Sequence, residues 1–212
     1  MKNKNALAFF AASAKNDSSN ISVKFNNKND HTDLDAAFVM RYTTPDMSLC
    51  DLGTGPGLIV NRIYDSVKKI VAVEPFKEYT DKIIRSGNIK IVNKTIADFE
   101  TDELFDIVTF FATAHYFNEK EIWQVYRKCF NFLKPSGTLI VKNQFGIYED
   151  VVIDGFSEEI NANYFAEYRH LPKEMSILST IGFTDINVID IYPPESNRWK
   201  NTHFYAIVCC RP

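Results

Sequence analysis

Three glycines at alternate positions, Gly53, Gly55 and Gly57, follow an apolar run that ends at Asp51. Glycine adopts backbone conformations with positive φ readily, and it lets a ligand approach the main chain closely. A short apolar run followed by such a turn predicts a buried strand, a glycine loop and then a helix, an arrangement in which α/β proteins hold nucleotides. The stretch CDLGTGPG at 50–57 therefore constrains the fold more than any other part of the chain.

The glycine spacing argues against a nicotinamide oxidoreductase, which stays an open alternative, and the residues that follow the glycines exclude a triphosphate-binding loop. The dinucleotide fingerprint is G-x-G-x-x-G, and the third glycine here comes one residue too early. A triphosphate-binding loop ends in Gly-Lys-Ser/Thr, whereas Leu58 and Ile59 stand at that place. Glu74 ends the next predicted strand, where an acidic side chain accepts hydrogen bonds from ribose hydroxyls. A carboxylate at this place suits both NAD and S-adenosylmethionine.

From residue 47 onward, the hydrophobic pattern alternates between strands and helices. Near-continuous apolar runs, such as LFDIVTFFA at 104–112, predict strands that are buried on both faces and hence a parallel sheet between helices. The last two predicted strands, 183–192 and 203–210, have no helix between them and must be antiparallel. We predict an α/β fold with a Rossmann-like sheet of seven strands, mostly parallel with an antiparallel last strand, and helices on both faces.

The chain length of 212 residues predicts one domain. Residues 1–30 open with a short helical pattern and continue as an asparagine-rich stretch, so we expect a partly flexible N-terminal arm. The domain itself is expected over 31–212. An insertion at about 146–170 is too long for a plain connection, and we expect it to form a lid or wall on the acceptor side.

Composition and charge exclude several classes of function. The formal net charge of −3 argues against a nucleic-acid-binding protein, which normally presents a basic face. None of the cysteines forms a C-x-x-C pair, so we expect no metal site. No apolar window reaches the roughly 18 residues that a membrane span needs. We therefore expect a cytoplasmic protein that acts on a small molecule, and a homodimer is one option for its assembly.

Five motifs in order resemble those of the class I S-adenosylmethionine-dependent methyltransferases: LCDLGTGPG, VAVEP, IADF, FDIVTFFATAHYF and FLKPSGTLIVKNQF. The resemblance implies S-adenosylmethionine as cofactor and S-adenosylhomocysteine as product. It places Asp51 near the ammonium group of the cofactor, Glu74 on the ribose, and Asp98 and Phe99 on the adenine. The cofactor-binding residues that we expect are Asp51, Gly53, Thr54, Gly55, Gly57, Glu74, Pro75, Asp98, Phe99 and Ala112.

The segments NQFG, EYRH and RWKNTHFYAIV resemble a narrower branch, the bacterial surface-polysaccharide and small-molecule tailoring methyltransferases. This resemblance implies O-methylation of a sugar or a nucleotide-linked sugar in capsule or lipopolysaccharide biosynthesis. An N-methyltransferase that acts on an amino sugar or another amine is an open alternative. A binding module that holds the cofactor without chemistry is another.

Acceptor residues are expected at the carboxyl ends of the parallel strands, where open α/β sheets bind ligands. His115, His170 and His203 fall on this rim, and a histidine is well matched to deprotonate a hydroxyl near neutral pH. An antiparallel last strand beside the fifth strand would bring His203 near Asn143. The residues that we expect to bind the acceptor are Tyr116, Asn143, Gln144, Arg169 and Arg198, the two arginines as grips for a phosphate or carboxylate.

Overall fold

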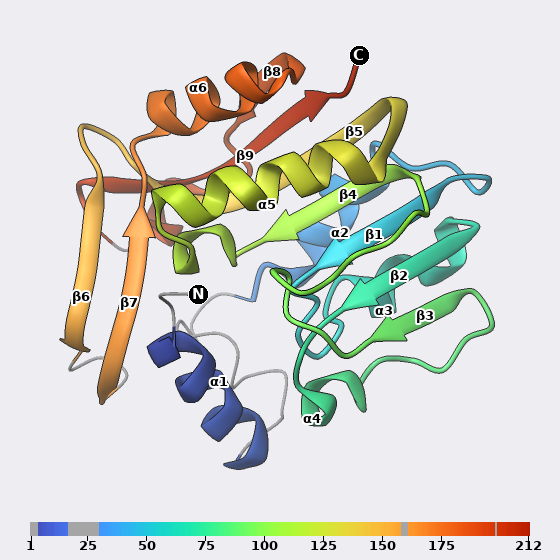
Figure 1. The fold of residues 1–212 in the computed structure, drawn as a ribbon, viewed down its shortest axis with the longest axis horizontal. Coiled ribbons are helices and arrows are strands. Elements are labelled where there is room, and N and C mark those ends of the chain that lie inside the picture. The colour runs from blue at the N-terminus through green and yellow to red at the C-terminus, as the bar shows by residue number, and fades with distance from the viewer. Residues whose placement is uncertain (1–3, 17–29, 158–160, 198) are drawn as a thin grey trace.

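The computed structural model describes residues 4–16, 30–157, 161–197 and 199–212. Its centre is a seven-stranded sheet with the order β3-β2-β1-β4-β5-β9-β8 (Figure 1). The strands are β1 (Ser48–Leu52), β2 (Lys69–Val73), β3 (Ile89–Val92), β4 (Phe105–Phe111), β5 (Leu133–Gly146), β8 (Thr184–Ile189) and β9 (Thr202–Cys210).

The predicted sheet is confirmed, including its antiparallel last strand. β1 pairs in parallel with β2 and β4, and the parallel pairing continues from β2 to β3 and from β4 to β5. β9 lies antiparallel between β5 and β8. The carboxyl ends of β1, β2, β4 and β5 therefore meet at one edge of the sheet, and β9 begins at the same edge.

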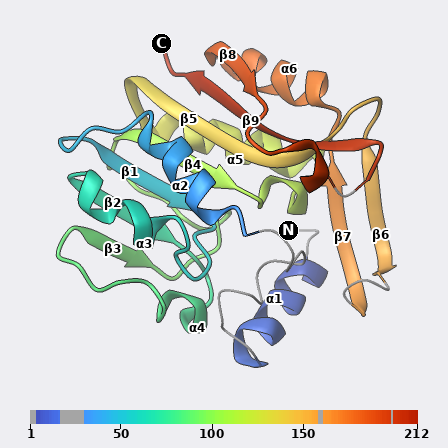
Figure 2. The same ribbon diagram turned by 180° about the vertical axis from the view of Figure 1, so that it is seen from behind.

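Helices cover both faces of the sheet. The helices α5 (Glu119–Phe132) and α6 (Leu171–Ile181) lie in front of it in Figure 1, and α2 (Thr32–Met40) and α3 (Val60–Ile63) lie in front of it in the reverse view of Figure 2. One hydrophobic core fills each side, with Val108 and Phe110 under α5 and Leu49 and Ile140 under α2 and α3. Alternation along the buried strands supplies both cores, because successive side chains point to opposite faces.

The local sequence of α5 explains where this helix begins. Asn118 accepts a hydrogen bond from the backbone N–H of Glu121, and the Glu121 carboxylate accepts one from the N–H of Asn118. This reciprocal capping box satisfies two N–H groups that the first turn leaves unpaired. The preceding 3-10 turn η2 (Ala114–Tyr116) is thereby held directly after β4, at the carboxyl edge.

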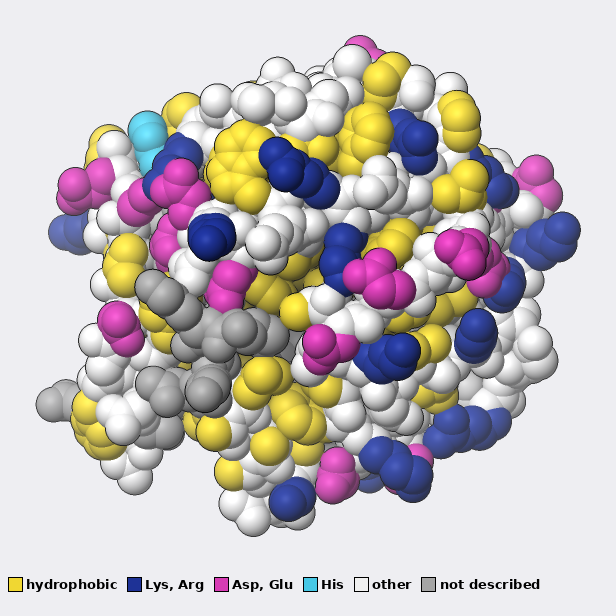
Figure 3. Space-filling model, viewed as in Figure 1, with side chains coloured by type: hydrophobic (Ala, Val, Ile, Leu, Met, Phe, Trp, Pro, Cys, Tyr) yellow, Lys and Arg dark blue, Asp and Glu magenta, His cyan; other side chains and the backbone are white. Residues whose placement is uncertain are grey.

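Two further elements flank this edge. The helix α1 (Lys4–Asn16) and the helical turn α4 (Lys77–Thr80) lie below the sheet in Figure 1, and a hairpin of β6 (Val151–Ser157) and β7 (Ala162–Tyr168) stands beside it. Hydrophobic side chains gather on α1, on the face that Figure 3 presents. The hairpin occupies most of the insertion that the sequence marks at 146–170, and β7 packs against α1 and η2. Among the described residues, no helix combines the length and hydropathy needed to cross a bilayer.

Candidate functional site

A cavity opens at the carboxyl edge of the sheet and has two halves. The first half is built from the turn after β1, the end of β2 and the segment after β3. The second half is built from α2, the segment after β4, and β5, and residues of α1 line the cavity as well. The charged side chains that line it, among the residues that the structure describes, are Asp35, Asp51, Glu74 and Lys142.

The glycine turn forms the floor of the first half. Gly53, Gly55 and Gly57 have φ values of +77°, +56° and +77°, which side chains other than glycine adopt at a cost. The N–H of Gly53 donates to the carbonyl of Val73 at 2.9 Å and ties the turn to β2. A Cβ atom at Gly53 would lie 2.7 Å from Thr113 Oγ1, so the turn packs directly against the segment that follows β4.

Glu74 stands at the end of β2 with its carboxylate over this turn. Its Oε2 accepts a hydrogen bond from the N–H of Gly55 at 3.0 Å, and its Oε1 accepts one from Phe76 at 3.2 Å. Burial raises the pKa of Glu74 to about 7, because the desolvation of the carboxylate outweighs these two hydrogen bonds. Each oxygen keeps a lone pair for a further donor, which is what a ribose diol requires.

Asp51, the last residue but one of β1, lies deep in the same half. Its Oδ1 accepts a hydrogen bond from Thr109 Oγ1 at 2.7 Å, and burial raises the pKa of its carboxyl above the usual value. Among the described residues that line the cavity, Lys142 is the only cation, and it belongs to the second half. The first half therefore suits a phosphate-free adenosine cofactor, whose ammonium group Asp51 would meet and whose ribose Glu74 would hold.

The predicted adenine contacts need correction. Asp98 is exposed and its carboxylate accepts a hydrogen bond from Thr95 Oγ1 at 2.6 Å, whereas Phe99 is buried in the core against Phe132. Neither lines the cavity, and Thr95 and Ile96 line it instead. The chain turns after β3, with the Asp98 N–H bonded back to Thr95, and this turn carries the later residues away from the edge.

The remaining predicted cofactor residues divide in the same way. The turn residue Gly57 does not line the cavity, because it packs against Asn61 and Ile83. Ala112 lines it directly after β4, with a φ of +50° that is uncommon for a side chain other than glycine. The other predicted cofactor residues that line the cavity are Asp51, Gly53, Thr54, Gly55, Glu74 and Pro75.

The three predicted histidines share the edge but not the cavity. His115 Nδ1 lies 2.7 Å from Asn143 Oδ1, and its ring packs between Tyr116 and Tyr168. β9 lies beside β5 as expected and places His203 opposite Phe145, two residues from Asn143. Because Asn143 and Phe145 face the α5 side of the sheet, both histidines lie on that side, away from the cavity wall.

His170 and His203 each form a hydrogen bond within the fold. His203 Nε2 lies 2.9 Å from Asp190 Oδ2, and its ring packs on Tyr205. His170 precedes α6, and its Nε2 lies 3.1 Å from the carbonyl of Ile147. None of the three predicted histidines lines the cavity, so a catalytic role for them does not follow from the geometry.

The predicted phosphate grip is also corrected. The Arg169 side chain is 1% exposed, and it donates to the Glu174 carboxylate and to the carbonyls of Ala114 and Phe117 at 2.9 and 2.6 Å. It therefore fastens the η2 segment to α6 and cannot reach a ligand. Arg198 lies outside the described residues.

Among the other predicted acceptor residues, only Tyr116 lines the cavity. The Asn143 Oδ1 is engaged by His115, while its buried Nδ2 has no hydrogen-bond partner among the described residues, and Gln144 Nε2 donates to Thr202 Oγ1 at 2.6 Å. Lys142, which precedes Asn143 on β5, lines the cavity instead, because alternation along the strand turns its side chain to the α2 side of the sheet.

Sequence reasoning missed a polar cluster in the second half. Lys142 Nζ donates to Asp35 Oδ2 and to the Tyr192 hydroxyl, both at 2.6 Å, and this hydroxyl donates to Asp35 Oδ1 at 2.7 Å. Lys142 and Asp35 are 7% and 6% exposed. The available signal was a lone lysine inside the apolar strand TLIVKNQF, since charged side chains are rarely buried without a partner.

Part of the chain matches a known protein family. Residues 49–137 match the family model of a methyltransferase domain. None of the curated proteins matches the chain in sequence.

Solved structures share the fold at low sequence identity. The 1,6-didemethyltoxoflavin-N1-methyltransferase of Burkholderia thailandensis superimposes with a TM-score of 0.76 at 12% identity, over 97% of this chain and 88% of that one. The N-methyltransferase NodS of Bradyrhizobium japonicum gives a TM-score of 0.69 at 12% identity, over 95% and 98%. The cyclase SpnF gives 0.66 at 14% identity, over 87% and 86%. One fold hosts several reactions. The domain match over 49–137 and the first half of the cavity therefore say more about function than the shared fold does.

Proposed function

We propose that this chain, an S-adenosylmethionine-dependent methyltransferase, methylates a hydroxyl oxygen of a small molecule that binds in the second half of the cavity. The observation that carries the proposal is the continuity of the cavity. One hollow joins the turn and carboxylates of the cofactor half to Tyr116, Asp35 and Lys142. An acceptor there would lie beside the cofactor, as an in-line displacement requires.

The protein contributes orientation and exclusion of water to such a transfer. The bound cofactor supplies a methyl group that is already activated on a sulfonium sulfur. Phe111, Phe117 and Phe10 of α1 line the cavity with apolar surface. Their side chains exclude water, which strengthens the electrostatic contacts of the reacting groups.

A sugar is the acceptor that the sequence resemblance favours, within surface-polysaccharide biosynthesis in the cytoplasm. Hydroxyl-bonding side chains of the second half, Asp35 and Lys142, support it. A nucleotide-linked sugar has less support, because Arg169 is buried in the fold and cannot contact the phosphates of such a sugar. We propose α1 as the acceptor-side wall and the hairpin at 146–170 as its support, since β7 packs against α1 while no described residue of the hairpin lines the cavity. The cysteines Cys50, Cys129, Cys209 and Cys210 are free thiols, in keeping with a reducing compartment.

An amine is the second candidate acceptor. Two of the structures that share the fold are described as N-methyltransferases, which motivates this alternative. An amine needs no strong base, so variants of nearby acidic and basic groups would leave its methylation largely intact.

The test begins with cofactor binding and continues with turnover. Titration calorimetry of the purified protein with S-adenosylhomocysteine should give saturable binding at one site per chain. A screen of sugars, nucleotide-linked sugars, phenols and amines with labelled S-adenosylmethionine then identifies the acceptor class. Absence of binding to both forms of the cofactor would refute the proposed function.

A further inference from the structure

We propose that Asp35 and Lys142 bind the acceptor hydroxyl as a pair, Lys142 donating a hydrogen bond to its oxygen and Asp35 accepting its proton. This inference rests on the proposed function and narrows the acceptor to a hydroxyl compound. Both side chains line the cavity, and neither belongs to the half that holds the cofactor.

The hydrogen-bonding capacity of the pair is not used up within the fold. An ammonium group carries three N–H donors, and Lys142 uses two of them, on Asp35 and on Tyr192. No described residue accepts the third. Each oxygen of the Asp35 carboxylate accepts one hydrogen bond here, from Lys142 or Tyr192, and retains a further lone pair. One ligand hydroxyl can therefore accept from Lys142 and donate to Asp35 at the same time.

This arrangement selects a hydroxyl over an amine. A protonated amine can donate to Asp35, but it has no lone pair to accept from Lys142. It would also add a positive charge beside a buried ammonium group, where like charges repel strongly. A hydroxyl is neutral and has both a donor and an acceptor.

The position of the pair in the sheet agrees with a role in the transfer. Lys142 on β5 lies opposite Phe111 on β4, and its carbonyl accepts a hydrogen bond from the N–H of Ala112 at 2.7 Å. The next residue, Thr113, is the one whose side chain abuts the glycine turn at Gly53. The pair is thus one strand away from the segment that touches the cofactor half.

A purely stabilising role explains the pair less well. A buried ion pair contributes little net stability, because the loss of hydration cancels most of the attraction between the charges. Lys142 also lies over the rings of Phe111 and Tyr192, at 5.1 Å from each centroid, so its stem is firmly placed. A fixed ammonium group with one free donor at a cavity wall is a preorganised binding group.

The chemical step balances with these two groups. The acceptor oxygen forms a bond to the methyl carbon while the carbon–sulfur bond breaks and its electron pair stays on sulfur. The hydroxyl proton moves to the Asp35 carboxylate, which later releases it to water. Lys142 stays protonated throughout and stabilises the negative charge that develops on the oxygen.

Phenol and its methyl ether, anisole, make a matched pair of probes. Both fit an aromatic-walled cavity, but only phenol has a hydroxyl that donates. We expect the S-adenosylhomocysteine-loaded protein to bind phenol about tenfold more tightly than anisole, as measured by ligand-observed NMR titration. Lys142→Met and Asp35→Asn should each abolish this preference while the affinity for S-adenosylhomocysteine stays unchanged.

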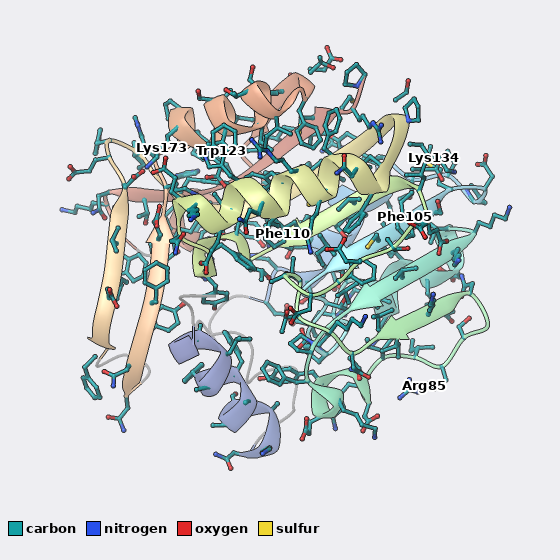
Figure 4. All side chains as sticks on the ribbon, viewed as in Figure 1. Arg85, Phe105, Phe110, Trp123, Lys134 and Lys173 are labelled. Atoms are coloured by element: carbon teal, nitrogen blue, oxygen red, sulfur yellow. The ribbon has the colours of Figure 1, made fainter. Side chains whose placement is uncertain are left out.

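Lys134→Met is the control. Lys134 also sits on β5 and pairs with a carboxylate, Asp106 Oδ2 at 2.8 Å, but at the opposite end of the strand from β6 and β7 (Figure 4). This variant should keep the preference for phenol. Equal binding of phenol and anisole by the wild type, or a preference that survives in both cavity variants, would overturn the proposal.

A double variant addresses loss of folding, and S-adenosylhomocysteine binding by the wild type separates failure of the Asp35–Lys142 proposal from failure of the proposed function. If either single variant does not fold, the double variant Asp35→Asn/Lys142→Met leaves the wall uncharged. Loss of the preference in that protein supports the pair, and its retention overturns it. Failure of the wild type to bind S-adenosylhomocysteine would instead refute the proposed function.

Discussion

Protonation of Glu74 should control the affinity of the cofactor site. The carboxylate is buried over the glycine turn, and its pKa is raised to about 7. Ribose hydroxyls donate hydrogen bonds, so they bind the ionised carboxylate more tightly than the protonated one, which is a weaker acceptor. The affinity for S-adenosylhomocysteine should therefore rise as the pH rises through 7, with release of a proton on binding.

The size of the effect follows from the raised pKa. With a pKa of about 7, roughly one tenth of the carboxylates are ionised at pH 6 and roughly nine tenths at pH 8. The dissociation constant should fall about tenfold between these pH values, which is about 1.4 kcal/mol. Calorimetry at both pH values, in buffers of different ionisation enthalpy, measures the affinity and the released proton together.

Two variants separate Glu74 from other titrating groups. Glu74→Gln keeps the size of the side chain and should remove the pH dependence, with weaker binding at pH 8 by about 1.5 kcal/mol. Asp98→Asn changes an exposed carboxylate that does not line the cavity, so both affinity and slope should persist. A flat wild-type profile, or an unchanged slope in Glu74→Gln, would show that the reasoning is wrong.

Three further variants test the glycine turn, the buried Arg169, and His170 together with His203. Gly53→Ala should weaken S-adenosylhomocysteine binding by about 1–2 kcal/mol or more, because the φ of Gly53 is +77° and the added Cβ would meet Thr113. Gly87→Ala is the control: a Cβ added at Gly87 would have no neighbouring atom within 4 Å, so binding in the same titration should be unchanged. Arg169→Met should lower the free energy of unfolding by about 3–5 kcal/mol in urea, since the buried Glu174 carboxylate loses its cation and keeps only the hydrogen bond from the Tyr126 hydroxyl. A loss below about 1 kcal/mol would contradict this role. The double variant His170→Gln/His203→Gln should keep its rate of methyl transfer, and a collapse of kcat with normal cofactor affinity would restore a histidine mechanism.

Local sequence signals are enough to predict the sheet and most of the residues that line the cofactor half of the cavity. The apolar runs are strong local signals, and the alternate glycines have backbone requirements that only their own positions can meet. Glu74 follows in the same way, since a residue that ends a parallel strand must lie at the carboxyl edge. These inferences depend on neighbours along the chain or on the topology of the sheet alone.

Which side chains reach the cavity depends on how the elements pack in three dimensions. The sequence places His115, His203 and Lys142 at the same edge of the sheet. The face on which each side chain lies follows from packing and alternation, which turn the histidines toward α5 and Lys142 toward α2. Asp35 and Lys142 are more than a hundred positions apart in the sequence, and only the packing of α2 on the sheet makes their ion pair. A spacing pattern cannot reveal such a pair, because its geometry depends on how distant elements dock.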